Sequence, residues 1–255
     1  MTGLVSWDSV ALPGGEACFR ITLSAPRANA LEPDLLADLH RAFDALPQSG
    51  AQKALICGGR NFSTGGDVGR FLAAALEGRA EDYAKQVVPA LQDLVARMID
   101  MPVVFATALR GAATGGSAGM VFAADLAVAA PGSFVQPYYG AMGFAPDGGW
   151  AAVLPARIGA AQAQGWLMAN HRHGADELLR LGLVQAIDAA PEAKALALLG
   201  AVETGTALVT KAIIWNGPRR AEVRAGLDAE TAAFLDLIGR PETLSRMKQF
   251  LQPGG

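Results

Sequence analysis

The stretch from Arg110 to Trp150 limits most strongly what this chain can form, because it is rich in glycine and alanine and holds only three charged residues. It closes on a Pro-Asp-Gly-Gly turn, in which Asp147 stands in an otherwise apolar neighbourhood. Small residues let backbone N–H groups approach a ligand closely, since no Cβ stands in the way. N–H donors together with a single acid suggest a reaction in which a carbonyl is polarised and a proton is moved.

Length and composition are typical of an α/β protein with closely packed helices. The chain has 255 residues, of which 51% are hydrophobic and 7% aromatic, with 30 glycines. This length can bury a substantial single core. The net charge is −3, and no block of lysine or arginine stands out, which argues against nucleic acid as a partner.

The sequence shows no sign of export or of membrane insertion. Cys18 and Cys57 are too few and too scattered for a disulfide framework or a zinc site. The first residues contain neither a basic segment nor a long apolar run, and no uninterrupted apolar stretch reaches about 18 residues. His171 and His173 lack the cysteine or carboxylate neighbours that a metal site needs. We therefore expect a cytoplasmic protein with no signal peptide, no membrane span and no bound metal.

Hydrophobic periodicity predicts an alternation of strands and helices followed by an all-helical end. We expect strands at Leu4–Leu12, Ala17–Leu23, Lys53–Cys57, Pro102–Leu109, Leu126–Ala130, Phe134–Gln136 and Gln185–Ile187. We expect a loop at Pro26–Ala30 and helices from Pro33 to about Leu46, from Val68 to Ile99 with a weak patch at Gly78-Arg79, from Gly115 to Ala123, around Pro155–Met168, at Asp176–Leu181 and after about Pro191. The apolar helical end is expected to fold back or to swap onto a neighbouring subunit.

Two Gly-Gly turns, Thr64-Gly65-Gly66-Asp67 and Thr114-Gly115-Gly116-Ser117, follow strands and run into predicted helices. A helix start leaves N–H groups unpaired and has a partial positive charge. Two such turns on neighbouring strands could direct two N–H groups at one oxygen, as in an oxyanion hole. The alternative is that both are ordinary strand-to-helix turns.

Asp147 allows two interpretations as well. An aspartate directly before a helix is commonly an N-cap, which would lower its pKa. An aspartate among apolar residues such as Met142 and Phe144 can be a general acid or base with a raised pKa. The sequence leaves both open.

Several segments together resemble the crotonase (enoyl-CoA hydratase/isomerase) superfamily. They are PRANAL at 26–31, FSTGGDV at 62–68, GAATGGSAG at 111–119, GFAPDGGW at 143–150 and the run that starts RIGAAQAQGW at 157. The resemblance covers about residues 5–190 in register. It implies an α/β fold built as a spiral of β-β-α units over residues 1–190, with an α-helical C-terminal region, 191–255, that mediates trimerisation and covers the pocket.

The resemblance also implies an acyl-CoA thioester as substrate, no separate cofactor, and a homo-oligomer that is a trimer or a dimer of trimers. By position, the N–H groups of Gly66 and Gly116 hold the thioester oxygen, and Arg27-Ala28-Asn29 holds the adenine and phosphate end of CoA. Lys248 or Arg246 of a neighbouring subunit is a further candidate for CoA. The predicted substrate contacts are Arg27, Ala28, Thr64, Gly65, Asp67, Gly115, Tyr138 and Tyr139.

Departures from the family pattern favour one chemistry. Hydratases of the family use two glutamates, and the matching positions here are Gly119 and Tyr138. Asp147 matches the site where isomerase members keep a single acid, which moves a proton from C2 to C4 of a 3-enoyl-CoA. We therefore predict an enoyl-CoA isomerase with Asp147 as acid and base.

Other activities remain as alternatives. The same aspartate is the nucleophile of aryl-CoA dehalogenases, but their helper histidine and tryptophan are replaced here by Gln92 and Tyr139. A hydratase or C–C hydrolase that uses Asp147 to hold water is a second alternative. The third is a catalytically silent acyl-CoA-binding protein.

Overall fold

The computed structural model describes residues 3–252 and contains two sheets. The larger sheet has six strands in the order β1-β2-β3-β4-β6-β9. Its strands are β1 (Val5–Ala11), β2 (Ala17–Leu23), β3 (Lys53–Cys57), β4 (Val104–Leu109), β6 (Leu126–Ala129) and β9 (Ala186–Ile187). The hairpin of β1 and β2 is antiparallel, and every later pairing in this sheet is parallel.

A second, three-stranded sheet has the order β5-β7-β8. Its strands are β5 (Ala112–Thr114), β7 (Phe134–Gln136) and β8 (His173–Gly174). The chain leaves β4 for β5 and later leaves β6 for β7, so that successive turns add one strand to each sheet. An isolated bridge between Ser63 and Ala113 continues this pattern to the loop after β3. The chain thus winds as a spiral of strand pairs and helices.

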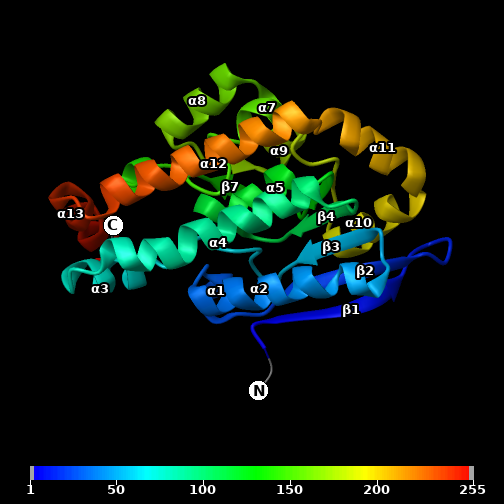
Figure 1. Cartoon of the computed structure of the whole chain (residues 1–255), viewed down its shortest axis with the longest axis horizontal. Helices are drawn as coiled ribbons and strands as arrows, with labels where there is room; N and C mark the ends of the chain where they lie inside the picture. Colours follow the sequence, from blue (N-terminus) through cyan, green and yellow to red (C-terminus); the bar gives the residue numbers. More distant parts are fainter. Residues whose placement is uncertain (1–2, 253–255) are drawn as a thin grey trace.

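Helices cover both faces of the larger sheet and make up the end of the chain (Figure 1). They are α1 (Pro26–Asn29), α2 (Pro33–Ala45), η1 (Pro47–Ser49), α3 (Val68–Leu76), α4 (Ala80–Asp100), η2 (Gly115–Ser117), α5 (Ala118–Ala123), α6 (Tyr139–Met142), α7 (Leu154–Ile158), α8 (Ala160–Ala169), α9 (Ala175–Arg180), α10 (Pro191–Ala201), α11 (Thr204–Ile214), α12 (Gly217–Ile238) and α13 (Pro241–Phe250).

The sheet separates two apolar cores. One face packs against α2 and α4 in a large core that includes Phe43 and Phe105, whose rings stack with centroids 5.5 Å apart. The other face packs against α10 in a smaller core that includes Cys57 and Leu199. All residues of β3 and β4 are buried, as expected for central strands of a parallel sheet covered on both sides.

The C-terminal helices return to the end of the molecule where α3 and α6 lie. Helix α12 runs along α4 for much of its length, and α13 contacts α3 and α6 (Figure 1). In this structure the helical end therefore folds back onto its own chain.

One interpretation of local structure needs correction. Pro26–Asn29, predicted as a loop, forms the short helical turn α1, in which Arg27, Ala28 and Asn29 have φ values of 52°, 55° and 58°. The side chain of Asn29 stabilises this left-handed turn, because its Nδ2 donates to the carbonyl oxygens of Asn61 and Phe62 at 3.1 and 3.0 Å. Asparagine is among the residues that tolerate this conformation best.

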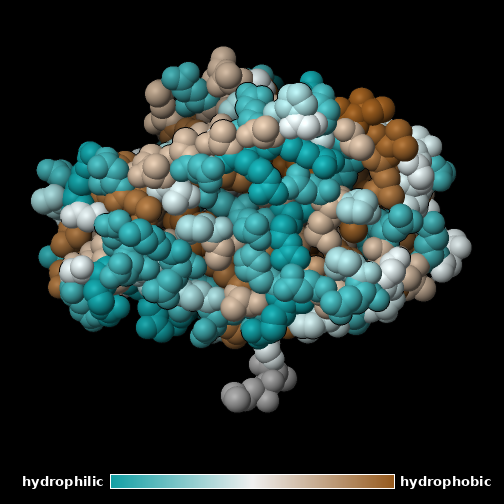
Figure 2. Space-filling model, in the orientation of Figure 1, coloured by the Kyte–Doolittle hydropathy of each residue, from teal (hydrophilic) through white to brown (hydrophobic). Residues whose placement is uncertain are grey.

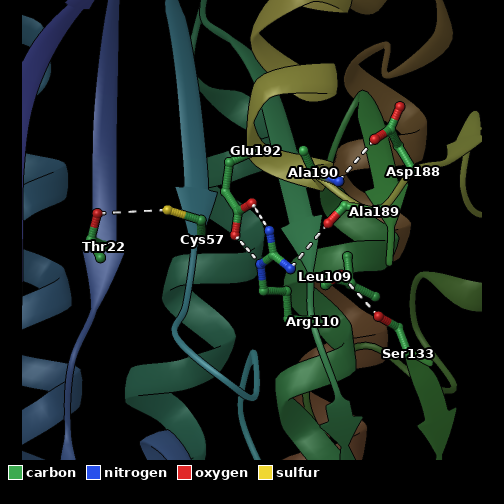
Figure 3. A network of polar contacts seen from close by, with 9 residues as sticks. All are labelled: Thr22, Cys57, Leu109, Arg110, Ser133, Asp188, Ala189, Ala190 and Glu192. Atoms are coloured by element: carbon green, nitrogen blue, oxygen red, sulfur yellow. Dashed lines mark hydrogen bonds and ion pairs between the residues drawn. The ribbon is translucent and has the colours of Figure 1, made fainter. Parts of the chain in front are cut away.

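A polar network joins the carboxyl end of β4 to the start of α10 (Figure 3). Arg110 donates from Nε and Nη2 to both carboxylate oxygens of Glu192, each at 2.7 Å, and from Nη1 to the carbonyl oxygen of Ala189. The Arg110 carbonyl oxygen accepts from the N–H of Phe62 at 2.8 Å. This network anchors the base of the loop that follows β3.

Among the described residues, no single helix is both long and apolar enough to cross a membrane. Only α10 and α11 together reach that length and hydropathy, and they meet at a bend of 96°.

Candidate active site

The two Gly-Gly turns lie side by side. The N–H of Thr114 donates to the carbonyl oxygen of Ser63 at 3.1 Å, which aligns the two segments just before the glycines. A Cβ added at Gly65 would lie 2.5 Å from the carbonyl oxygen of Thr114 and 3.5 Å from the Cα of Gly115. Gly65 and Gly115 have φ values of 75° and 52°, a region that favours glycine. The two turns are therefore adjacent, which is the arrangement that an oxyanion hole made from both would require.

Gly66 and Gly116 line one cavity, and neither has room for a side chain. A Cβ at Gly66 would lie 2.9 Å from the ring of Phe71. A Cβ at Gly116 would lie 2.6 Å from the side chain of Leu91 and 2.7 Å from Oδ1 of Asp147. The two predicted oxyanion donors and the predicted acid therefore lie together, although they come from three separate parts of the chain.

The cavity has a volume of about 380 Å³. Of the predicted site residues, those that line it are Arg27, Thr64, Gly65, Gly66, Asp67, Gly115, Gly116, Tyr138, Tyr139 and Asp147. Ala28 is not part of the lining, and its carbonyl oxygen accepts from the N–H of Thr64 at 3.1 Å. Ala28 thus contributes to the shape of the binding loop through its backbone.

Asp147 is 7% exposed and accepts a hydrogen bond from the hydroxyl of Tyr139, with 2.5 Å between Oη and Oδ1. Burial raises the pKa of Asp147 to about 6, although the Tyr139 bond acts in the opposite direction. Helix α7 begins only at Leu154, so the interpretation of Asp147 as a helix cap is wrong. Its carboxylate faces the cavity instead.

Tyr138 and Tyr139 have different environments. Tyr139 is buried, and both burial and the charge of Asp147 raise the pKa of its hydroxyl well above the ordinary value, so that it remains a donor. Tyr138 has a φ of 63°, and its N–H donates to Oδ1 of Asn170 at 2.8 Å. Its ring packs edge-on against Phe250 of α13, with 6.1 Å between centroids. Tyr139 therefore supports the acid, while Tyr138 forms part of the cavity wall.

Position 119, where a hydratase of the family keeps its first glutamate, is filled by backbone. A Cβ added at Gly119 would overlap the carbonyl oxygen of Gly148. Gly148, at φ 65°, in turn packs against the backbone of Gly116. The turn that follows Asp147 thus occupies the space into which a side chain from position 119 would extend.

Charged residues gather at the mouth of the cavity. Nε of Arg27 lies 2.7 Å from Oδ2 of Asp67, and the Arg27 guanidinium also pairs with Glu32. Arg70 lies 3.4 Å from the second oxygen of Glu32. Asp67 also caps α3 by accepting from the N–H of Arg70 at 3.0 Å. The predicted CoA-binding arginine is therefore held at the entrance by two carboxylates.

Three phenylalanines form an apolar wall. The ring centroids of Phe71 and Phe144 lie 5.7 Å apart, and that of Phe234 lies 5.6 and 5.1 Å from these two. All three line the cavity. This wall offers an apolar surface to the acyl part of a ligand.

A family model described as enoyl-CoA hydratase/isomerase matches residues 14–216. The chain belongs to the enoyl-CoA hydratase/isomerase family. This family processes acyl-CoA thioesters, as its relatives' names indicate.

Two curated relatives are enzymes named as hydratases. A cyclohexa-1,5-dienecarbonyl-CoA hydratase of Thauera aromatica is 32% identical over 180 residues, which cover 69% of this chain and 66% of the relative. A probable enoyl-CoA hydratase of Rhodobacter capsulatus is 30% identical over 189 residues, which cover 71% of this chain and 68% of the relative. The matches thus span about two thirds of these relatives' own length.

Solved structures of both hydratases and isomerases share the fold of this family member. An enoyl-CoA hydratase from Bacillus halodurans aligns with a TM-score of 0.85 at 23% identity, covering 97% of this chain and 100% of that one. An enoyl-CoA isomerase from Mtb aligns with a TM-score of 0.76 at 20% identity, covering 92% and 100%. These alignments confirm the predicted crotonase-like fold.

Helix α12 contributes to the site of this enoyl-CoA hydratase/isomerase family member, which no sequence motif indicated. Glu230, only 4% exposed, lies behind the turn that follows Asp147, and Phe234 lies in the acyl wall. The buried positions of α12 form one helical stripe in which Glu230 is the only charged residue, but the sequence of this helix hardly separates apolar from polar faces, so the stripe is visible only in the structure. The stripe consists of Val223, Leu227, Glu230, Phe234 and Ile238.

Phe250 and Leu251, at the end of the described chain, also line the cavity and were not predicted. Arg246, one of two proposed CoA contacts, donates to the carbonyl oxygen of Gly140 within its own chain at 3.3 Å. Within residues 3–252, no group of three or more histidine, cysteine or carboxylate side chains is arranged to hold a metal ion.

Proposed function

We propose that this chain is an enoyl-CoA isomerase that moves a double bond by proton transfer through an enolate. Asp147 takes a proton from C2 of a 3-enoyl-CoA, and the electron pair of that C–H bond delocalises onto the thioester oxygen. The N–H groups of Gly66 and Gly116 hold this oxygen while it is negative. Asp147 then returns the proton at C4, which leaves the double bond between C2 and C3.

The observation that carries this proposal is the position of Asp147. Its carboxylate is buried, lines the cavity and lies against Gly116, one of the two expected oxyanion donors. Burial raises its pKa to about 6, close to the range in which a carboxylate can both accept and return a proton near neutral pH. The hydroxyl of Tyr139 fixes one carboxylate oxygen, so the other is the candidate base.

The absence of room at position 119 supports isomerisation over hydration by two glutamates. The carbonyl of Gly148 occupies that space, and Tyr138 stands at the second glutamate position. One acid therefore has to perform both proton transfers, which matches an isomerase. Donors in an oxyanion hole typically contribute about 3 kcal/mol each to transition-state stabilisation.

Hydration through a single acid is the second candidate, because both curated relatives described above are named as hydratases. In this alternative, Asp147 positions and deprotonates a water molecule. A catalytically silent acyl-CoA-binding protein is the third.

The decisive experiment supplies purified protein with 3-enoyl-CoA and with 2-enoyl-CoA. An isomerase forms the conjugated 2-enoyl thioester from the first, seen as an increase in ultraviolet absorbance. A hydratase converts the second to a 3-hydroxyacyl-CoA, measured by chromatography. A silent protein turns over neither but binds acyl-CoA in calorimetry.

Asp147→Asn separates these outcomes further, with Asp228→Asn on the exposed face of α12 as the matched control. Loss of isomerisation in Asp147→Asn alone supports the proposal. If Asp147→Asn retains wild-type isomerisation, Asp147 is not the base.

We further propose a homo-oligomer, a trimer or a dimer of trimers, as a second feature shared with the family. Helix α11 exposes apolar side chains in a patch that Figure 2 shows at its upper right, consisting of Val209, Ile213 and Ile214. Exposed apolar patches of this kind mark contact surfaces. Sedimentation velocity would measure the state directly.

A further inference from the structure

Glu230 is a buried carboxylate in α12 that the proposed chemistry does not use. It lies on the buried stripe of a helix otherwise anchored by apolar residues such as Leu227 and Phe234. A charged group in such a position is costly unless it is hydrogen-bonded. Its partners therefore indicate what it does.

Those partners are backbone N–H groups of the turn that directly follows Asp147. Oε2 accepts from the N–H of Gly149 at 2.8 Å, and Oε1 accepts from the N–H groups of Ala151 and Ala152 at 2.6 and 3.0 Å. One carboxylate thus satisfies three N–H groups of a turn that belongs to no helix or strand. Without it, the buried N–H of Gly149 and the partly buried N–H groups of Ala151 and Ala152 would lose their acceptor, and an unpaired buried donor is destabilising.

A second layer of contacts fixes Glu230 in turn. Nε2 of Gln92, from α4, lies 3.5 Å from Oε2 of Glu230, and the hydroxyl of Thr231 donates to Oε1 of Gln92. The turn itself is packed tightly, because Gly148 contacts the backbone of Gly116 and leaves no space at Gly119. The turn between Asp147 and Ala152 is therefore held from both sides.

We propose that Glu230 is a positioning residue, which holds the Asp147 carboxylate against Gly116 by binding the N–H groups of Gly149, Ala151 and Ala152. The role of the positioned carboxylate in catalysis rests on the proposed function. The contacts themselves do not depend on it.

The electrostatics agree with this arrangement. Burial, together with the smaller effect of the Asp147 charge, raises the pKa of Glu230 to about 7, while the bonds from the three N–H groups act in the opposite direction. The groups that face the two acids are Tyr139 from α6 and Gln92 from α4. In the described part of the chain, neither acid forms an ion pair with a cation.

The test compares Glu230→Gln and Glu230→Ala with Glu222→Gln, an exposed glutamate on the same helix. The first measurement is the pKa of Asp147 by carbon-13 NMR of its carboxyl group, which requires no activity. If Glu230 holds Asp147 in its buried position, Glu230→Ala lets the turn open, and the pKa of Asp147 falls from about 6 toward its ordinary value. A pKa that stays unchanged in Glu230→Ala overturns the inference.

The second measurement is kcat and KM for 3-enoyl-CoA, together with exchange of the C2 proton of an acyl-CoA in D₂O. We expect kcat to fall by about 10–100-fold in Glu230→Ala and less in Glu230→Gln, with KM changed by less than about threefold, because misplacement of a catalytic group by about 1 Å has effects of this size. Glu222→Gln should match the wild type. An unchanged kcat in Glu230→Ala contradicts a positioning role. So does a loss of acyl-CoA affinity as large as the fall in kcat.

The two proposals fail in different ways. A wild-type protein that neither isomerises 3-enoyl-CoA nor exchanges the C2 proton disproves the proposed function, and the NMR titration then decides the role of Glu230 alone. A wild type that does both, with Glu230→Ala equally active, disproves only the positioning role.

Discussion

The carboxylate of Asp147 is buried and that of Glu192 is partly buried, but their partners differ and so do the directions of their pKa shifts. Glu192 binds Arg110 through both oxygens at 2.7 Å (Figure 3). Although burial alone would raise the pKa of Glu192, the Arg110 hydrogen bonds hold it below its usual value. Asp147 has a tyrosine hydroxyl in place of a cation, and burial raises its pKa to about 6.

The two carboxylates therefore have different roles: Glu192 stabilises the fold, and Asp147 is the candidate acid and base of the site. The Arg110–Glu192 pair keeps its charges at neutral pH and fastens the base of a site loop to α10. Asp147 lies where its proton can be gained or lost near neutral pH. The charge of Glu192 is thus neutralised by Arg110, whereas the charge of Asp147 has no cation beside it among the described residues.

The sign of each contribution to stability follows from linkage. For Glu192, whose folded pKa is lowered, the contribution is present above the unfolded pKa and is lost as pH falls through the folded value. For Asp147, the folded state binds its proton more tightly between 3.8 and about 6. Folding is therefore penalised progressively as pH rises through this window, and the penalty is complete above it.

Asp147→Asn should have the largest effect, because it is expected to lower activity and to raise stability. Loss of the base should lower kcat/KM by about 10³-fold. The free energy of unfolding at pH 8 should rise by up to about 3 kcal/mol, because a neutral amide avoids the cost of burying a carboxylate whose pKa is raised to about 6. Urea denaturation at pH 8 and pH 4 measures this, and the gain should shrink at the lower pH. A variant less stable than the wild type at pH 8 would contradict the assignment of an uncompensated charge.

Gly119→Ala tests the packing that surrounds this charge. The new methyl group would overlap the Gly148 carbonyl, so we expect the free energy of unfolding to fall by about 3 kcal/mol. Gly165→Ala in α8, where a Cβ meets no atom within 4 Å, is the matched control and should be neutral or slightly stabilising. Thermal denaturation of both variants suffices. Equal effects of the two substitutions would show that position 119 has space for a side chain.

The pH dependence of activity distinguishes Asp147 from Glu192 under conditions in which the protein stays folded. Because Asp147 has to be ionised to take a proton, kcat/KM should fall about tenfold per pH unit below about pH 6. Glu192→Gln should leave this limb of the profile where it is, since Glu192 lies outside the cavity lining. A limb near pH 4 in the wild type would mean that Asp147 is not desolvated as described.

Glu192→Gln should have the smallest effect. Loss of the paired charge is expected to lower the free energy of unfolding at pH 7 by about 1 kcal/mol, with kcat within about twofold of the wild type. This destabilisation should diminish as pH falls and Glu192 of the wild type is protonated. Glu177→Gln, which breaks an exposed pair with Arg180, is the control and should have less effect still. A larger loss of activity than of stability would assign Glu192 to the site rather than the scaffold.

Local patterns were sufficient to predict most strands and helices and to single out the two Gly-Gly turns and Asp147, whereas the spiral arrangement and the roles of these residues came only from the resemblance to the crotonase superfamily. The continuous apolar runs of β3 and β4 identified central strands, and the hairpin of β1 and β2 followed from alternation. The two Gly-Gly turns and Asp147 were found because residues of unusual type occur there in short motifs. In each case, the information lies within about ten consecutive residues.

Other features were not predicted, because they depend on contacts between distant residues or on irregular backbone. Glu230 bonds to Gly149 across 81 positions, so no short motif contains both. The hydrogen bond from Tyr139 to Asp147 lies in an irregular segment that follows a left-handed residue, Tyr138. The cap interpretation of Asp147 failed because Gly148 and Gly149, both at positive φ, delay the next helix until Leu154.

The bonds from Gly149, Ala151 and Ala152 to Glu230 also have a consequence for the order of events during synthesis. A ribosome delivers Asp147 about 80 residues before the carboxylate that satisfies the adjoining turn. A nascent chain with both sheets complete thus still lacks a finished site. Catalytic competence should therefore be among the last properties that a newly made molecule acquires.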